Sequence, residues 1–326
     1  MLQNNATHKP LLVKLGCQRY GAGSDSILQF YERHGVQHIA SGPDGSWTAG
    51  NIKKMRKRAE SYGINVLATH IPLSGNILLA DAEQRDQRIK EICDIIQIGA
   101  DGGYSMLFYN LGVHSWISPR TEPTPGRGGV SYSTWNIAKA DLPQETGDAI
   151  SEKVMWEKIT YLLEKVIPVA EKCKIFLACH PPDPPVPLSK GIPQVLATVE
   201  GLKKFVEIID SDYHGLHFCQ GTLCEMLQEP EKEIYDIIQW FGERKKIINV
   251  HFRNIRGKRN GFYETYPDEG DIDMLKAMRV YKEVGYGGMI MPDHLPNHPD
   301  DPQQHEGFAF AYGYIRALMQ AVCSEE

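Results

Sequence analysis

Residues 150–180 read ISEKVMWEKITYLLEKVIPVAEKCKIFLACH, and this segment shows most clearly the pattern from which we predict the fold. From 150 to 173 apolar residues recur at the spacing of a helix that buries one face. From 174 to 180 the pattern changes to a short apolar run, typical of a buried strand. A helix followed by a buried strand is the repeating unit of many α/β proteins. The apolar positions of the helix are Val154, Ile159, Leu162, Leu163, Val166 and Ile167.

The same unit recurs along the whole chain. Alternating strands and helices imply parallel strands joined by right-handed crossovers. Eight units in 326 residues predict a (β/α)₈ TIM barrel better than the alternative, an open doubly wound sheet. Because no composition shift marks a boundary, we expect one TIM-barrel domain over residues 1–326. The predicted strands are 11–18, 36–41, 64–70, 104–110, 174–180, 215–219, 247–254 and 288–293.

Residues 111–148 interrupt the alternation of strands and helices with a segment rich in Pro, Gly, Ser and Thr. We interpret it as a long loop between the fourth strand and the fourth helix. In a barrel this loop would lie at the C-terminal mouth, where barrel enzymes have their active sites, so we predict an active-site lid. A second insertion, residues 256–270, follows the seventh strand on the same side. The alternative is that both loops lie on the surface and have no role at the active site.

The composition limits the partners of the chain. With 41 Asp and Glu against 35 Lys and Arg, the formal charge of −6 argues against nucleic-acid binding. No run approaches the ~20 apolar residues that span a bilayer, and the first ten residues lack the features of a signal peptide. We therefore expect a cytoplasmic protein that does not bind a membrane. Seven cysteines without a CxxC pair argue against a disulfide framework.

Four residues that can bind a metal stand at the C-terminal ends of late strands: His180, Cys219, His251 and Asp293. Successive members are 39, 32 and 42 residues apart, about one strand–helix unit each, so a barrel would gather them around one axis. Any one of them alone would more often be an ordinary buried residue. Two imidazoles, a thiolate and a carboxylate could hold zinc, manganese or ferrous iron.

Other polar residues near the strand ends are candidates for substrate binding. Arg253 could clamp a carboxylate with its planar guanidinium group. The alternative is that Arg253 and Asn254 only satisfy loop carbonyls. The predicted substrate-binding residues are Arg19, His70, Asn110, Arg253 and Asn254.

The motifs YNLGVHSWISPRT, CHPPDPP, FCQGT, NVHFRNI, GDIDMLKAM and PDH, in this order, resemble the mannonate dehydratases of the xylose-isomerase-like barrel superfamily. The resemblance implies a barrel that converts D-mannonate to 2-dehydro-3-deoxy-D-gluconate and water. It implies one Mn²⁺ or Fe²⁺ ion bound by His180, Cys219, His251 and Asp293. It also implies catalytic roles for His294 and for Tyr312, one as acid and the other as base. The chain departs from the family at Leu295, where the family has Gly after PDH.

We therefore expect a hydro-lyase of hexuronate degradation that acts on a small sugar acid. One alternative is a metal-dependent sugar isomerase or epimerase of the same superfamily, whose ligands are more often Glu and Asp. Another is a non-catalytic sugar-acid-binding protein, which would lack acid and base groups. The sequence leaves open whether the protein forms a homo-oligomer, which metal it carries, and which of His294 and Tyr312 is the base.

Overall fold

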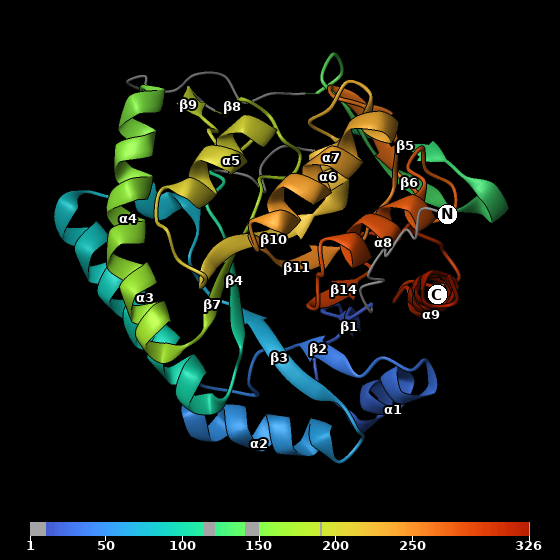
Figure 1. The fold of residues 1–326 in the computed structure, drawn as a ribbon, viewed down its shortest axis with the longest axis horizontal. Coiled ribbons are helices and arrows are strands. Elements are labelled where there is room, and N and C mark those ends of the chain that lie inside the picture. The colour runs from blue at the N-terminus through green and yellow to red at the C-terminus, as the bar shows by residue number, and fades with distance from the viewer. Residues whose placement is uncertain (1–10, 114–120, 141–149, 190, 326) are drawn as a thin grey trace, which may run out of the picture.

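The computed structural model describes residues 11–113, 121–140, 150–189 and 191–325. In this part of the chain eight parallel strands close into a barrel, in the order β1-β14-β11-β10-β7-β4-β3-β2, with helices around it (Figure 1). The predicted (β/α)₈ barrel is therefore confirmed over the open sheet. The barrel strands are β1 (Lys14–Cys17), β2 (His38–Ala40), β3 (Asn65–His70), β4 (Met106–Asn110), β7 (Phe176–His180), β10 (His214–Cys219), β11 (Ile247–His251) and β14 (Met289–Met291).

Each of the eight predicted runs overlaps one barrel strand, but β11 and β14 end two or more residues earlier than predicted. β11 stops at His251 and β14 at Met291. Arg253, Asn254 and Asp293 were predicted to lie inside these strands and instead lie in the segments that follow them. Such segments at the C-terminal ends of barrel strands can turn polar side chains toward the mouth.

The helices start where the sequence supplies a side-chain cap. Ser151, for example, accepts a hydrogen bond from the Val154 N–H at the start of α4, and Asp273 caps α8 in the same way. In α4 the predicted apolar stripe is buried except at Val154, which is 37% exposed, while its neighbour Met155 is buried. The helices are α1 (Asp25–Arg33), α2 (Ala49–Glu60), α3 (Ala82–Gly102), α4 (Glu152–Cys173), α5 (Val199–Glu207), α6 (Gln220–Cys224), α7 (Pro230–Glu243), α8 (Met274–Glu283) and α9 (His305–Cys323).

The barrel buries two separate apolar clusters. The larger one lies between the strands and the surrounding helices. The smaller one contains mostly residues of the barrel strands and includes Ala40, Ala68 and Ala178, whose small side chains leave room for Phe108 and Met291. With these packed layers beneath it, the C-terminal end of the barrel is the place where polar side chains gather.

The two insertions form one sheet, which the sequence did not predict. Residues 111–148 were expected to be a loop, but they contain β5 (Thr121–Pro125), the 3₁₀ turn Arg127–Gly129 and β6 (Ser131–Asn136). The second insertion forms β12 (Ile255–Lys258) and β13 (Gly261–Glu264). β6 pairs with β13, giving a four-stranded sheet in the order β12-β13-β6-β5. The loop prediction failed there because the partner strand comes from a distant segment.

Two shorter elements complete the described structure. A small hairpin joins β8 (Leu188–Ser189) to β9 (Ile192–Pro193), and the 3₁₀ helix η1 (Gly75–Leu78) precedes α3. Residues 114–120 and 141–149, which belong to the predicted lid, lie outside the described residues. The lid therefore stays a prediction.

Trp135 offers a test of how the insertions are held. It is buried and stands opposite Phe262 in the β6–β13 pairing. We expect W135A to lower the free energy of unfolding by about 3–5 kcal/mol, since a large buried aromatic is lost. We also expect faster proteolysis within residues 121–136, measured by mass spectrometry of the fragments. The control is W156A, because Trp156 is only partly buried on α4, outside this sheet; equal cleavage in the two variants would contradict the prediction.

Candidate metal centre

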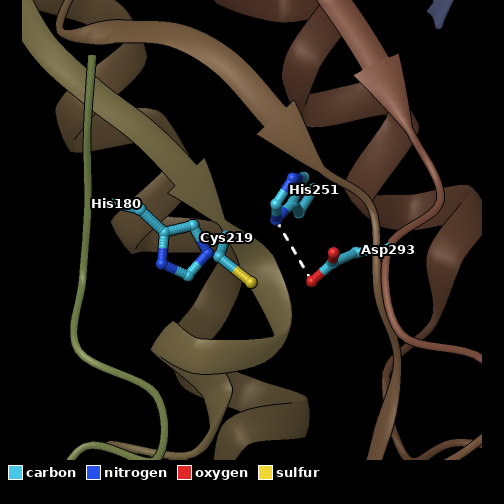
Figure 2. Close-up of side chains that lie close together, drawn as sticks. All are labelled: His180, Cys219, His251 and Asp293. Carbon is cyan, nitrogen blue, oxygen red and sulfur yellow. Dashed lines mark ion pairs between the residues drawn. The ribbon is translucent and has the colours of Figure 1, made fainter. Parts of the chain in front are cut away.

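The four predicted metal ligands meet at one point of the structure. One donor atom from each of His180, Cys219, His251 and Asp293 can be chosen so that all four lie within 4.8 Å of one another. Figure 2 shows their side chains pointing toward one another from neighbouring strand ends. Ligands bound to one ion at roughly 2.0–2.3 Å are at most about 4.6 Å apart. The cluster is therefore close to the size that a single ion requires.

His180 is oriented as a metal-binding histidine would be. Its Nδ1 lies 2.6 Å from the carbonyl oxygen of Pro181 and donates to it. A hydrogen bond of this kind fixes the tautomer and leaves the Nε2 lone pair for a metal ion. Burial lowers the pKa of His180, which also favours the neutral form that a metal needs.

Cys219 has an environment that stabilises a thiolate. Its sulfur accepts hydrogen bonds from the backbone N–H of Thr222 and from Arg253, each at 3.5 Å. Burial alone would raise the pKa of the thiol, but the positive charge of Arg253 and the contact with His251 outweigh it and lower the pKa. Since the thiolate is the form that binds metals, this residue suits the role.

Asp293 and His251 contact each other in the cluster. Their Oδ2 and Nδ1 atoms are 3.2 Å apart, as the dashed line in Figure 2 marks. Burial opposes the charge of Asp293, yet His251 and His294 hold the pKa of its carboxyl well below the usual range. Both ring nitrogens of His251 are buried, and apart from the contacts of the ring with Asp293 and Cys219 neither has a hydrogen-bond partner among the described residues. A buried imidazole with so few partners, beside an ionised carboxylate and a thiolate, fits a divalent metal ion.

Arg253 lies in a buried network of ion pairs. The side chain is 1% exposed and forms ion pairs with Asp183 at 2.8 Å, with Glu225 at 3.0 Å, and with Glu264. A guanidinium group already surrounded by three carboxylates favours the alternative that Arg253 satisfies groups of the protein itself, and the carboxylate clamp stays a prediction. Asp183, Glu264 and His294 also lie close enough to bind a metal, but Arg253 already supplies a positive charge there.

Asn254 and Asn110 satisfy backbone groups instead of facing a substrate. The Asn254 amide donates to the carbonyls of Pro267 and Ile272 and accepts from the N–H groups of Ile255 and Ile272. Asn110 donates to Pro181 and accepts from Gly112. For Asn254, the structure therefore supports the alternative of a loop-fixing side chain.

Tyr312 is not brought to the cluster. It is buried on α9, and its hydroxyl donates to the sulfur of Cys17 at 2.8 Å. Burial raises its pKa well above the usual value for tyrosine. The expected acid–base role needs a hydroxyl that reaches the substrate, whereas this hydroxyl is hydrogen-bonded to Cys17, so the role stays a prediction that the geometry does not support.

A polar pocket of about 460 Å³ opens beside the cluster. His294 lines it, and its Nδ1 lies 2.9 Å from Glu264 and 2.7 Å from Arg253. Burial lowers the pKa of His294, but the charges of Asp293 and Glu264 raise it further, to about 10. The predicted residues Arg19 and His70 also line the pocket, together with Gln18, Ser133, Glu264, Pro292, Asp293, Leu295, Asn297, Gln304 and Phe308.

Several residues at the site were missed from the sequence. Gln18 donates to Asp293 Oδ1 and contacts Nε2 of His70, each at 3.3 Å. His217 is fully buried beneath the cluster, with its ring centroid 3.9 Å from that of His251 and a hydrogen bond to Asn249. Their positions carried a signal, because Gln18 ends the first predicted strand and His217 shares a strand face with Cys219.

Fold and site together define a class of protein: a (β/α)₈ barrel with a candidate metal centre and a polar pocket at its C-terminal mouth. The family profile D-mannonate dehydratase (UxuA) matches residues 134–324. The mannonate dehydratase of Thermotoga maritima is 34% identical to this chain, over 86% of it and 89% of that protein. The chain therefore belongs to the mannonate dehydratase family, whose members are hydro-lyases.

Solved structures share the fold. The mannonate dehydratase from Streptococcus suis serotype 2 matches with a TM-score of 0.83 and 22% identity, covering 96% of this chain and 95% of that one. A D-tagatose 3-epimerase-like protein matches with a TM-score of 0.63 and 18% identity, covering 96% and 99%. Among the described helices, none is long and apolar enough to cross a membrane.

Cys219 gives a direct test of the metal centre. We expect C219S to bind Mn²⁺ or Co²⁺ at least ~10-fold more weakly than the unchanged protein, because a thiolate ligand is replaced by a neutral hydroxyl. Metal content after gel filtration and the sulfur-to-cobalt absorption band are the measurements. The control is C224S, since Cys224 is equally buried but lies outside the cluster. Full metal occupancy and an unchanged absorption band in C219S would mean that the thiolate is not a ligand.

Proposed function

We propose that this protein removes water from D-mannonate and releases 2-dehydro-3-deoxy-D-gluconate. Membership of the mannonate dehydratase family supports this function. The observation that carries it is the meeting of His180, Cys219, His251 and Asp293 beside a polar pocket that also contains acid and base groups. The reaction takes a proton from C2 and hydroxide from C3, and the resulting enol then becomes the ketone.

We propose that the four clustered residues hold one Mn²⁺ or Fe²⁺ ion. The buried donors, the stabilised thiolate and the imidazole of His251 with its few partners support this site. A bound divalent ion would supply Lewis acidity, which offsets the negative charge that develops next to the carboxylate when C2 loses its proton. The soft thiolate would also suit zinc, so the identity of the ion needs measurement.

His294 is the proposed group for one of the two proton transfers. It lines the pocket and follows Asp293 directly, so its ring stands beside the proposed ion without being one of the four donors. Glu264 accepts a hydrogen bond from Nδ1, which leaves Nε2 as the atom that exchanges a proton with the substrate. A carboxylate behind an imidazole holds the ring in one orientation and stabilises its charged form.

Arg19 is the proposed anchor for the substrate carboxylate. Its side chain lines the pocket and forms no ion pair with the described part of the chain. A guanidinium group can bind a carboxylate through two parallel hydrogen bonds. Arg19 therefore takes over the role that the sequence had also offered to Arg253.

The two alternatives are less well supported. An isomerase or epimerase of the same superfamily shares the barrel. However, the epimerase-like protein is 18% identical to this chain, whereas the two mannonate dehydratases described above are 34% and 22% identical. A binding protein without catalysis would need no acid or base group, whereas His294 and His70 line the pocket.

We also propose a single domain over residues 1–326 and a cytoplasmic location. The location is supported by seven cysteines without a disulfide, as expected in a reducing compartment.

The activity itself is tested with a panel of substrates. The Mn²⁺- or Fe²⁺-loaded protein should form a 2-keto-3-deoxy acid from D-mannonate, detected by mass spectrometry with a loss of one water. Chelation should abolish turnover, and adding the ion back should restore it. Other aldonates, uronates and ketoses serve as comparisons. An aldose–ketose interconversion without loss of water would favour the isomerase instead.

The carboxylate anchor is tested with R19M. We expect kcat/KM for D-mannonate to fall by about 10²–10³, because a charge-assisted pair of roughly 3–4 kcal/mol is lost between anchor and substrate. Steady-state kinetics measure the change, and metal content should not alter. R33M is the matched control, since Arg33 is a basic residue in the last turn of α1 and does not line the pocket. Equal kinetics in the two variants would exclude Arg19 as the anchor.

A further inference from the structure

The pocket must contain a second group for proton transfer besides His294. The tyrosine expected for this role donates to Cys17 instead. Among the described residues, the other side chains lining the pocket that can take up or release a proton are Glu264, Asp293 and His70. Glu264 is paired with Arg253, and Asp293 belongs to the proposed ligand set. His70 is the group that remains.

A chain of hydrogen bonds fixes which nitrogen of His70 carries a proton. The ionised carboxylate of Asp293 can only accept, so the Gln18 group facing it at 3.3 Å must be the amide NH₂. The Gln18 carbonyl oxygen then faces Nε2 of His70, also at 3.3 Å. A carbonyl oxygen can only accept, so Nε2 of His70 is the donor.

The opposite nitrogen of His70 is therefore an acceptor. A neutral imidazole carries one proton, and with Nε2 protonated the lone pair lies on Nδ1. Nδ1 has no hydrogen-bond partner among the described residues, and the residue is exposed to the pocket. A neutral ring with an unused lone pair can accept a proton.

His70 also stands on the correct wall of the pocket. Gln18, its hydrogen-bond partner, is followed directly by Arg19, the proposed anchor for the C1 carboxylate. C2 is bonded to C1, so the group that removes the C2 proton should lie near that anchor. His294 comes from the segment after β14, three strands away from β3 around the barrel, and so faces the substrate from another side.

We propose that His70 is the catalytic base that removes the C2 proton of the sugar acid, an inference that rests on the proposed function. Nδ1 of His70 forms a bond to this proton. The electrons of the C2–H bond become the C2–C3 double bond, and the C3–O bond breaks with its electrons on oxygen. The departing hydroxide takes a proton from His294 and leaves as water. His70 then returns its proton to C3, and the enol O–H proton passes to His294 as the C2 carbonyl forms, so both histidines regain their starting protonation.

The test compares H70Q with the unchanged protein, both loaded with Mn²⁺. We expect turnover of D-mannonate to fall by at least ~10², because one general base is lost. Metal content should stay the same, and KM should change less than about threefold, because His70 would act in the chemical step. The control is H38Q, since His38 begins β2 at the opposite end of the barrel; its kinetics should equal those of the unchanged protein.

A second variant separates a base from a structural residue. In H70A we expect added imidazole to restore part of the turnover, and more basic imidazoles to restore more, because the missing base is supplied from solution. Turnover of H70Q within tenfold of the unchanged protein would overturn the proposal. A loss of turnover with lost metal, or without rescue by any imidazole, would also overturn it. If the unchanged protein forms no keto product, the proposed function fails and this inference fails with it. If the unchanged protein forms the product and H70Q turns over within tenfold of it, only this inference is overturned.

Discussion

The buried guanidinium group of Arg253 is the interaction on which the site depends. It lies 1% exposed among the carboxylates of Asp183, Glu225 and Glu264, and it donates to the sulfur of Cys219. Asp183 follows β7 and Glu225 follows α6. Glu264 is the last residue of β13, and Cys219 is the last residue of β10. Removing one member of such a buried network leaves the others with uncompensated charge, which typically lowers the free energy of unfolding by about 3–5 kcal/mol. The network therefore fixes four segments relative to one another.

This arrangement couples the proposed metal centre to the proposed acid–base group. Arg253 contacts Cys219 on one side and Nδ1 of His294 on the other. Its charge lowers the pKa of the thiol, and its partner Glu264 also accepts from His294. Four carboxylates, those of Asp183, Glu225, Glu264 and Asp293, lie around the cluster, and a bound divalent ion would offset part of their negative charge. Through these charges, metal binding would be coupled to the protonation of the residues proposed to transfer protons.

The sequence predicted the barrel and the four clustered residues because both follow from periodicity. His180, Cys219, His251 and Asp293 each come one strand–helix unit after the last, and a closed barrel places strand ends around one axis. The roles given to Arg253 and Tyr312 are not supported by the geometry, because such roles depend on where side chains point. The partners Glu264 and Cys17 come from segments that no local pattern links to them. Residue type indicated what Arg253 can bind, and only the tertiary structure could say that it is already bound.

The sheet formed by the two insertions also contributes residues to the pocket. β13 ends at Glu264, which pairs with Arg253 and accepts from His294, and β6 brings Ser133 to the pocket. The pairing of β6 with β13 therefore holds a carboxylate that orients the proposed acid–base group. A barrel of this superfamily can keep its strands and change its chemistry through such segments, because the strand ends fix a metal while the insertions decide which groups surround the substrate. In this protein the inserted sheet supplies residues to the pocket of the proposed active site, so its stability bears directly on the geometry of His294.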